Sequence, residues 1–132
     1  MGDLTIKTVI RCADFEKSRA FYGDVLRLES LGDWDTPQGK GCIFGFGEKG
    51  AGGQLELFEL TPADPRFVPA FKEPVASDKL DVQLGTRDLA GWMERLKGVW
   101  AFEGPIEMPW GEKRIRLRDP DGLLVILHDE QG

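Results

Sequence analysis

The hydrophobic pattern is clearest near the end of the chain, where it predicts two paired strands. Arg114 to Arg118 alternates charged and apolar side chains, the period-two pattern of a half-buried strand. A turn follows over residues 119–122, because Pro120 presets its own φ and Gly122 accepts a positive φ without steric cost. Leu123 to Leu127 is a continuous apolar run, which is typical of a strand covered on both faces. We therefore predict a buried hairpin here.

Two other stretches change to a helical period, and each follows an aspartate. Aspartate is a favoured N-cap, because its carboxylate accepts a hydrogen bond from an otherwise free N–H of the first turn. We predict one helix from Asp14 to about Leu26–Leu28, and a second from Asp88 to a stop at Gly98. Their apolar stripes are Phe15, Ala20, Phe21, Val25 and Leu28 in the first, and Leu89, Trp92, Met93 and Leu96 in the second.

The remaining pattern predicts the same order of elements twice, a strand, a capped helix and three strands. Four prolines between residues 61 and 78 predict a linker, with one helical turn around Phe67–Phe71. We therefore predict an α+β fold in a single domain, residues 1–132, built from a first βαβββ module (4–60), a Pro-rich linker (61–78) and a second βαβββ module (79–129). The further predicted strands are residues 4–12, 29–35, 40–47, 54–60 and 79–85, while 99–102 and 107–110 lead into the hairpin.

Composition narrows the classes of partner. The chain has 132 residues and a formal charge of −6, which argues against nucleic acid and anionic membranes as partners. No apolar run reaches the roughly 20 residues of a membrane helix, and the N-terminus has no signal-peptide pattern, so we expect a cytoplasmic protein. Cys12 and Cys42 are then more typical of small buried apolar residues than of a disulfide.

Three motifs give the chain a resemblance to a known superfamily. The segment Ala13-Asp14-Phe15-Glu16-Lys17-Ser18-Arg19-Ala20-Phe21-Tyr22 and the turn Arg118-Asp119-Pro120-Asp121-Gly122 resemble the vicinal-oxygen-chelate superfamily of glyoxalases, extradiol dioxygenases and bleomycin-resistance proteins. Pro109-Trp110-Gly111 resembles the bleomycin-resistance branch. The resemblance implies tandem βαβββ modules whose curved mixed sheets surround a cavity. It also implies a homodimer with pockets at the subunit interface.

Enzymes of this superfamily hold a divalent metal on the first and last strands of each module. The resemblance places Lys7, Glu56, Asp81 and Ile126 at these positions. Lysine offers no lone pair and isoleucine no donor, so only Glu56 and Asp81 remain as candidate metal ligands. We therefore expect neither a metal nor another cofactor. Lys7 either takes the electrostatic role of the cation beside Glu56 and Asp81 or forms an ordinary cross-strand ion pair.

The resemblance also implies a small-molecule pocket with aromatic walls and a few polar groups. We predict no catalytic residue, and a ligand that is a small aromatic or cationic compound, with antibiotic sequestration as one such role. A metal-dependent lyase, isomerase or dioxygenase is the alternative, and an accessory module with a filled cavity is a third. The predicted ligand-binding residues are Lys7, Phe44, Phe46, Glu56, Phe58, Asp81, Trp100, Phe102 and Trp110, and Trp34 is expected at the rim.

Overall fold

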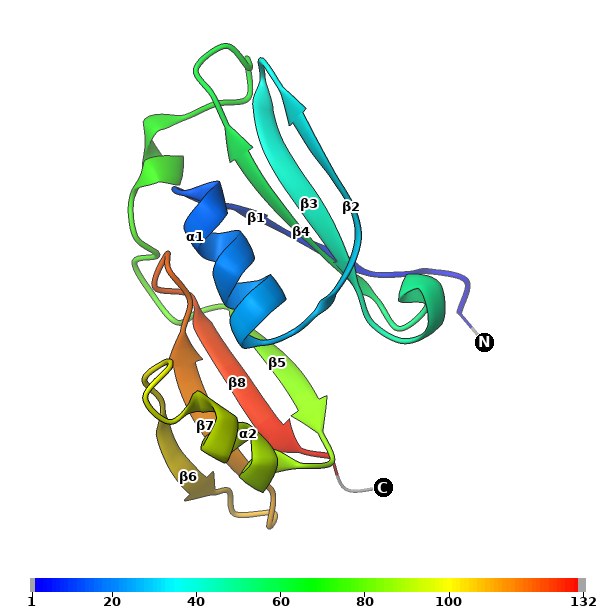
Figure 1. Ribbon diagram of the computed structural model, residues 1–132, viewed down its shortest axis with the longest axis vertical. Coiled ribbons are helices and arrows are strands. Elements are labelled where there is room, and N and C mark those ends of the chain that lie inside the picture. Colours follow the sequence, from blue (N-terminus) through cyan, green and yellow to red (C-terminus); the bar gives the residue numbers. More distant parts are fainter. Residues whose placement is uncertain (1, 131–132) are drawn as a thin grey trace. The chain divides into compact units, whose positions relative to one another are not determined.

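The computed structural model describes residues 2–130, and the chain forms two compact units that divide after Pro74 (Figure 1). Each unit contains one four-stranded mixed sheet, with strand orders β1-β4-β3-β2 and β5-β8-β7-β6. The N-terminal unit has β1 (Lys7–Arg11), α1 (Phe15–Arg19), η1 (Ala20–Val25), β2 (Glu29–Thr36), β3 (Gly39–Gly45), η2 (Glu48–Gly50), β4 (Gln54–Leu60) and η3 (Pro69–Lys72). The C-terminal unit has β5 (Asp81–Thr86), α2 (Leu89–Leu96), β6 (Glu103–Glu107), β7 (Lys113–Arg118) and β8 (Leu124–Asp129).

The two sheets share one connectivity. In each, the first strand pairs in parallel with the last, and the other neighbours are antiparallel. The α+β class and the tandem βαβββ order predicted from the sequence are therefore confirmed.

Two strand predictions were inaccurate. β1 begins at Lys7 rather than at residue 4, and the side chains of Leu4 and Ile6 are 92% and 69% exposed, so they add no buried face. β6 lies between the two segments that we expected to lead into the hairpin, and all five of its residues are exposed. Without a buried face a strand shows no apolar alternation, so this edge strand left no hydrophobic signal.

Both predicted N-caps form. The carboxylate of Asp14 accepts the N–H of Lys17 at 3.2 Å, and that of Asp88 accepts the N–H of Gly91 at 3.0 Å. Beyond Arg19 the first helix widens into the π-helical segment η1, where the N–H of Leu26 donates to the carbonyl of Phe21, five residues back, at 2.9 Å. The first helix ends at Val25, close to the predicted boundary.

The core of the N-terminal unit lies between the first helix and one face of its sheet. Leu57, Cys42 and Tyr22 are completely buried in it, and the rings of Phe21 and Tyr22 meet edge to face at 4.8 Å. The backbone N–H of Phe15 donates to Glu59 on β4 at 2.6 Å, which fixes the start of the helix on the sheet. Burying a leucine or an aromatic side chain contributes roughly 1.5–3 kcal/mol, so each of these core residues is a favourable term in the stability of the unit.

The closing hairpin of the C-terminal unit agrees with its prediction. Residues 123–127 are all buried, as expected of a strand covered on both faces. Asp119 Oδ1 accepts the N–H groups of Asp121 and Leu123 at 2.8 and 2.9 Å, and Gly122 takes a φ of 83°. The turn is thus held by its own aspartate and by the residue type that tolerates this φ. Within residues 2–130, every helix is too short or too polar to span a bilayer.

Candidate functional site

Three predicted site residues of the N-terminal unit come together on one face of its sheet. Directly paired residues of neighbouring strands have their side chains on the same face. Glu56 pairs with Ile43 and Val9, and Phe58 pairs with Gly41 and Arg11, so all of these share the face that turns away from the first helix. We call this surface the aromatic face. It consists of Lys7, Val9, Arg11, Trp34, Ile43, Glu56 and Phe58.

Lys7 and Glu56 form an ion pair on the aromatic face. Lys7 Nζ lies 3.1 Å from Glu56 Oε1, and the two side chains are 46% and 14% exposed. The carboxylate is thus the more buried partner, and the ammonium supplies its counter-charge. Such a half-exposed pair contributes little to stability. This geometry is compatible with both roles considered for Lys7, a substitute for a metal cation and a plain ion pair.

Trp34 and Phe58 form the aromatic centre of this face. Their ring centroids are 5.6 Å apart with the planes at 64°, an edge-to-face arrangement. Gly41 makes the arrangement possible, because a Cβ atom there would lie only 2.5 Å from the Trp34 ring. A Cβ at Gly39 would likewise come within 3.1 Å of the Phe58 ring. The glycines of β3 therefore leave the space in which the neighbouring rings lie.

Arg66 adds a cation that sequence reasoning missed. Its guanidinium carbon lies 5.4 Å from the centroid of the Phe58 ring. Nε and Nη2 donate to the two carboxylate oxygens of Asp64 at 3.0 and 2.7 Å. The side-chain hydrogen bonds from Arg66, followed by the bond from its backbone N–H, hold the pKa of Asp64 at about 2, below its ordinary value of 3.8. The available signal was the spacing Asp64-Pro65-Arg66, which favours a turn closed by the aspartate.

Phe44 corrects one part of the predicted pocket. We predicted that Phe44 and Phe58 line one pocket, but Phe44 pairs with Leu55 and therefore lies on the opposite face, toward the first helix. It is 2% exposed, and a Cβ atom at Gly23 would lie 3.5 Å from its ring. The grouping was wrong because side chains alternate along a strand, and Phe44 is an odd number of positions from Gly41. Phe46 follows the end of β3, half-buried, with its N–H bonded to Gly53 at 3.0 Å.

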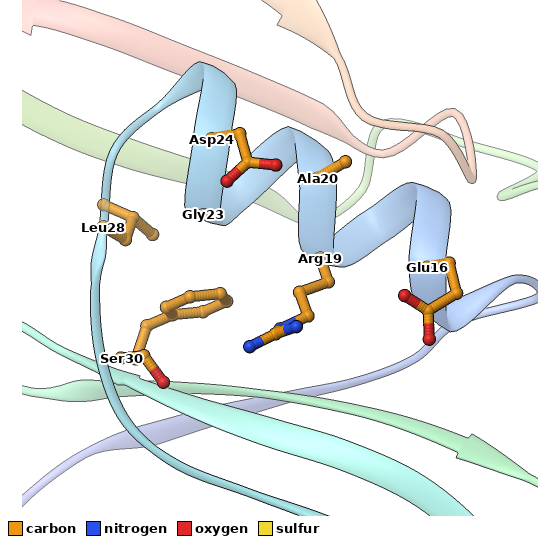
Figure 2. A pocket seen from close by; sticks show the side chains of 8 residues that line it. Glu16, Arg19, Ala20, Gly23, Asp24, Leu28 and Ser30 are labelled. Carbon is orange, nitrogen blue, oxygen red and sulfur yellow. The ribbon is translucent and has the colours of Figure 1, made fainter.

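A hollow of about 290 Å³ lies between the first helix and strands β2 and β3. Figure 2 shows the side chains of Glu16 and Arg19 on the helix side of this hollow. Phe44 is part of its wall. Two of its charged residues already have partners across the hollow's edge. Arg19 lies 3.3 Å from Asp33, and Glu16 lies 3.5 Å from Lys40. The lining residues are Glu16, Arg19, Ala20, Gly23, Asp24, Leu28, Ser30 and Phe44.

The predicted site residues of the C-terminal unit lie in three separate places. Asp81 is on β5, where Gln83 donates to it at 3.3 Å. Trp100 and Phe102 follow α2 and line a surface hollow of about 480 Å³, and Trp100 Nε1 donates to the carbonyl of Arg118 at 2.8 Å. Trp110 is 66% exposed at the loop before β7. Its Nε1 donates to Glu112 Oε2 at 3.2 Å, and the guanidinium carbon of Arg114 lies 5.9 Å from the centroid of its ring.

The face of the second sheet that carries Asp81 is dominated by arginines. Arg114, Arg116 and Arg118 of β7 share this face with alternate residues of β8, and we call it the arginine face. Arg114 Nη2 lies 2.6 Å from Glu112 Oε1, and Arg118 forms a bidentate ion pair with Asp78.

These arginine pairs perturb their acidic partners. Hydrogen bonds from Trp110 first and from Arg114 second lower the pKa of Glu112. The hydrogen bond from Arg118 lowers the pKa of Asp78. The guanidinium groups of this face are therefore already engaged by carboxylates of their own unit.

The residues at the implied metal positions do not fit a divalent ion. Lys7 directs an ammonium at Glu56, and Ile126 is an apolar residue of β8. An ammonium has no lone pair, and a hydrocarbon side chain has no donor atom. In the part of the chain that the structure describes, no three His, Cys, Asp or Glu side chains are grouped to hold a metal ion.

Comparisons with known proteins agree with this fold. The model of the Glyoxalase/Bleomycin resistance protein/Dioxygenase superfamily matches residues 6–127. TnmS3, an antibiotic-binding protein from Streptomyces sp. CB03234, has 24% identity and a TM-score of 0.70, with 98% of each chain covered. A glyoxalase/bleomycin resistance protein from the same organism has 25% identity and a TM-score of 0.64, covering 94% of this chain and 98% of that one.

A third solved structure is an enzyme. The lactoylglutathione lyase from Agrobacterium tumefaciens has 23% identity and a TM-score of 0.65, covering 98% of this chain and 95% of that one. The same fold thus occurs in binding proteins and in enzymes, so fold alone does not select a function. Among curated protein sequences, none matches this chain.

Proposed function

Since the chain belongs to the Glyoxalase/Bleomycin resistance protein/Dioxygenase superfamily, we propose that it binds a small aromatic compound on its aromatic face without using a metal. One observation carries the proposal. Trp34 is half-buried and supported edge-on by Phe58, with the Lys7–Glu56 ion pair on the same sheet face. Aromatic walls with a few fixed polar groups are the usual composition of a small-molecule site.

The ring of Trp34 supports this role because it is both positioned and accessible. Gly41 leaves space for it above β3, and the ring of Phe58 packs against it edge to face. Its indole N–H makes no hydrogen bond with any of residues 2–130 and is available to a ligand. A fixed ring loses little conformational freedom when a planar ligand stacks on it, so more of the stacking energy appears as affinity.

The ion pair of Lys7 with Glu56 limits how the aromatic face can bind a positively charged group of a ligand. We expected Glu56 to hold a positive group, but the ammonium of Lys7 already occupies one oxygen of that carboxylate at 3.1 Å. A cationic ligand must either displace Lys7 or share the carboxylate with it. Aromatic stacking is therefore the primary determinant in this proposal, and Glu56 a secondary one.

Antibiotic sequestration is the specific role that we propose. Two solved structures of this superfamily support it by their descriptions, an antibiotic-binding protein and a glyoxalase/bleomycin resistance protein. Homodimerisation, a cytoplasmic location and the ligand contacts of Asp81, Trp100, Phe102 and Trp110 stay predictions.

A metal-dependent lyase, isomerase or dioxygenase is the alternative, and it can be tested directly. Native mass spectrometry of freshly purified protein reports bound metal, retained organic ligand and subunit count together. We expect a metal-free species that carries a small organic mass. A stoichiometric divalent ion, removed by a chelator together with an enzymatic activity, would contradict the proposal.

Binding itself is tested with a panel of aromatic compounds that includes bleomycin, 2-naphthoate, 2-naphthamide and 2-naphthylmethylamine. We expect Trp34→Ala to weaken binding of the best compound by about tenfold or more, because an aromatic contact of this kind contributes roughly 1–2 kcal/mol. Trp92→Ala is the matched control, since Trp92 belongs to α2 in the other unit, where its ring contacts Arg95. Isothermal titration calorimetry measures both. Equal affinities for the wild type and Trp34→Ala would contradict the assignment of the binding site to the aromatic face.

A further inference from the structure

We propose that the aromatic face recognises an acidic substituent of its ligand, a carboxylate or an ionised phenol, through the guanidinium groups of Arg66 and Arg11. The proposal rests on the function proposed above and specifies the class of compound that the face selects. Phe58 is the common neighbour of the two arginines. Arg66 lies over its ring at 5.4 Å, and Arg11 is its direct partner across the β1–β4 pair.

Arg66 is held in position before any ligand arrives. Asp64 is 5% exposed, and it binds both Nε and Nη2 of the guanidinium as well as the backbone N–H of Arg66, the last at 2.8 Å. This leaves Nη1 without a hydrogen bond to residues 2–130, on a side chain that is 60% exposed. One edge of the guanidinium is thus fixed by the protein, while its other edge is available to an anion.

The loop that carries Arg66 is itself anchored to the sheet. Thr61 donates its backbone N–H to Gln38 at 2.9 Å and its hydroxyl to Pro37 at 2.8 Å, so the loop starts at the β2–β3 turn. The N–H of Asp64 returns to the carbonyl of Thr61 at 3.0 Å. These bonds reduce the freedom that Arg66 loses on binding a ligand, so the contact gains in affinity and selectivity.

Arg11 supplies the uncompensated charge. It is exposed at the end of β1 and forms no ion pair or side-chain hydrogen bond with the residues that the structure describes. The other charges of this face are already matched, Lys7 by Glu56 and Arg66 by Asp64. The remaining carboxylate that the register places on this face is Glu29, which pairs with Gly45 near the opposite end of β3. The end of the face around Phe58 therefore has an excess of positive charge.

This local charge is opposite in sign to that of the whole chain, which is −6. An acidic ligand is therefore attracted to this end of the aromatic face rather than to the protein in general. Guanidinium groups bind carboxylates through charge-assisted hydrogen bonds, and they stay protonated at any physiological pH. An aromatic acid can satisfy both parts of the face at once, its ring on Trp34 and its acid group between the two arginines.

The test compares two probes of one shape, 2-naphthoate and 2-naphthamide, which differ in charge. Binding is measured by calorimetry for the wild type, Arg66→Gln, Arg66→Lys and Arg11→Gln, with Arg87→Gln as the control for an exposed arginine of the other unit. We expect the wild type to bind the acid about tenfold more tightly than the amide. Arg66→Gln and Arg11→Gln should each remove most of this preference by weakening the binding of the acid, whereas Arg87→Gln should alter neither affinity.

The failure of this inference can be told apart from the failure of the proposed function. If both probes bind equally to the wild type and to every arginine variant, and Trp34→Ala still weakens binding, the arginines have no such role while the aromatic site stands. If neither probe binds, or if Trp34→Ala binds both as the wild type does, the proposed site is overturned and this inference with it. Arg66→Lys separates charge from geometry, because lysine retains the positive charge but lacks the planar guanidinium group. It should keep only part of the preference for the acid. Circular dichroism verifies that each variant is folded.

Discussion

The two sheets of this protein have the same connectivity, yet their equivalent faces carry opposite kinds of side chain. In the N-terminal unit, Gly41 of β3 lies beside Phe58 of β4. In the C-terminal unit, the equivalent pair is Arg114 of β7 beside His128 of β8. Along the same two strands, β3 and β7, Ile43 corresponds to Arg116 and Gly45 corresponds to Arg118.

This difference decides what each face can do. Residues without side chains on β3 leave room for the rings of Trp34 and Phe58 to lie across the strand. The arginines of β7 occupy the equivalent space and pair with carboxylates of their own unit. A single backbone scheme thus gives one face suited to an organic ligand and one face filled by ion pairs. The two faces differ because alternate residues of β3 include glycines, whereas those of β7 are arginines.

The largest effect is expected when Gly41, which lies beneath the ring of Trp34, is replaced by alanine. In Gly41→Ala the new Cβ would lie 2.5 Å from both the carbonyl oxygen of Leu57 and the Trp34 ring. We expect a loss of about 2 kcal/mol or more in the free energy of unfolding, because backbone must move to relieve the contact. Gly32→Ala is the control, since nothing lies within 4 Å of its Cβ. Urea unfolding measures both, and equal stabilities would show that the space above Gly41 is not closely filled.

The equivalent position of the second unit is tested by removing its charge. Arg114→Met keeps the apolar stem but leaves Glu112, whose side chain is 19% exposed, without its ion-pair partner. We expect a loss of about 1–2 kcal/mol in the free energy of unfolding. Lys97→Met removes a pair in which both side chains are more than 70% exposed, and should change stability by about 0.5 kcal/mol or less. If the two variants cost the same, the arginine face is an ordinary solvated surface.

The Asp64 carboxylate that holds Arg66 in place can be tested by the dependence of stability on acidic pH. The pKa of Asp64 is lowered from 3.8 to about 2, so the folded state keeps this group ionised where the unfolded state protonates it. Its stabilising effect is complete above about pH 4 and disappears as pH falls to about 2. We expect the Tm difference between wild type and Asp64→Asn to shrink over this interval. A Tm difference that is the same at pH 5 and at pH 2 would show that the folded state does not hold Asp64 ionised.

The smallest effect is expected on the helix-facing side, where the two units are alike. Cys42 of β3 and Ile115 of β7 occupy equivalent positions, and neither has measurable exposure. Burial raises the pKa of the Cys42 thiol to about 11. We expect no reaction of Cys42 with a disulfide reagent at pH 8 until the protein is unfolded in guanidinium. Prompt labelling of the native protein would show that this side of the N-terminal sheet opens readily.

Much of the fold could be predicted because its signals are local. Asp14 and Asp88 are N-caps that act on the next three residues, and the closing hairpin combines period-two alternation with a turn of defined chemistry. β6 gave no such signal, since an exposed edge strand buries no face. Hydrophobic pattern reports burial, so an element that buries nothing is invisible to it.

The site was less predictable because it depends on which face each residue occupies and on loop geometry. The ion pair of Lys7 with Glu56 was one of the partners considered, and the structure confirms it. Phe44 was grouped with Phe58, which lies on the other face of the sheet, because the glycines of β3 obscure the alternation of its side chains. Arg66 was missed because its position depends on how a Pro-rich segment returns to the sheet, which no periodicity describes.

The measurement that tests the central claim most directly is a ligand titration followed by NMR of the tryptophan indole groups. The chain has four tryptophans, of which Trp34 belongs to the N-terminal unit and Trp92, Trp100 and Trp110 to the C-terminal unit. With the indole signals assigned by single Trp→Phe substitutions, 2-naphthoate is added in steps. We predict a saturable shift of the Trp34 indole signal, with that of Trp110 unchanged. A shift of the Trp100 or Trp110 signal while Trp34 stays fixed would contradict the assignment of the binding site to the aromatic face.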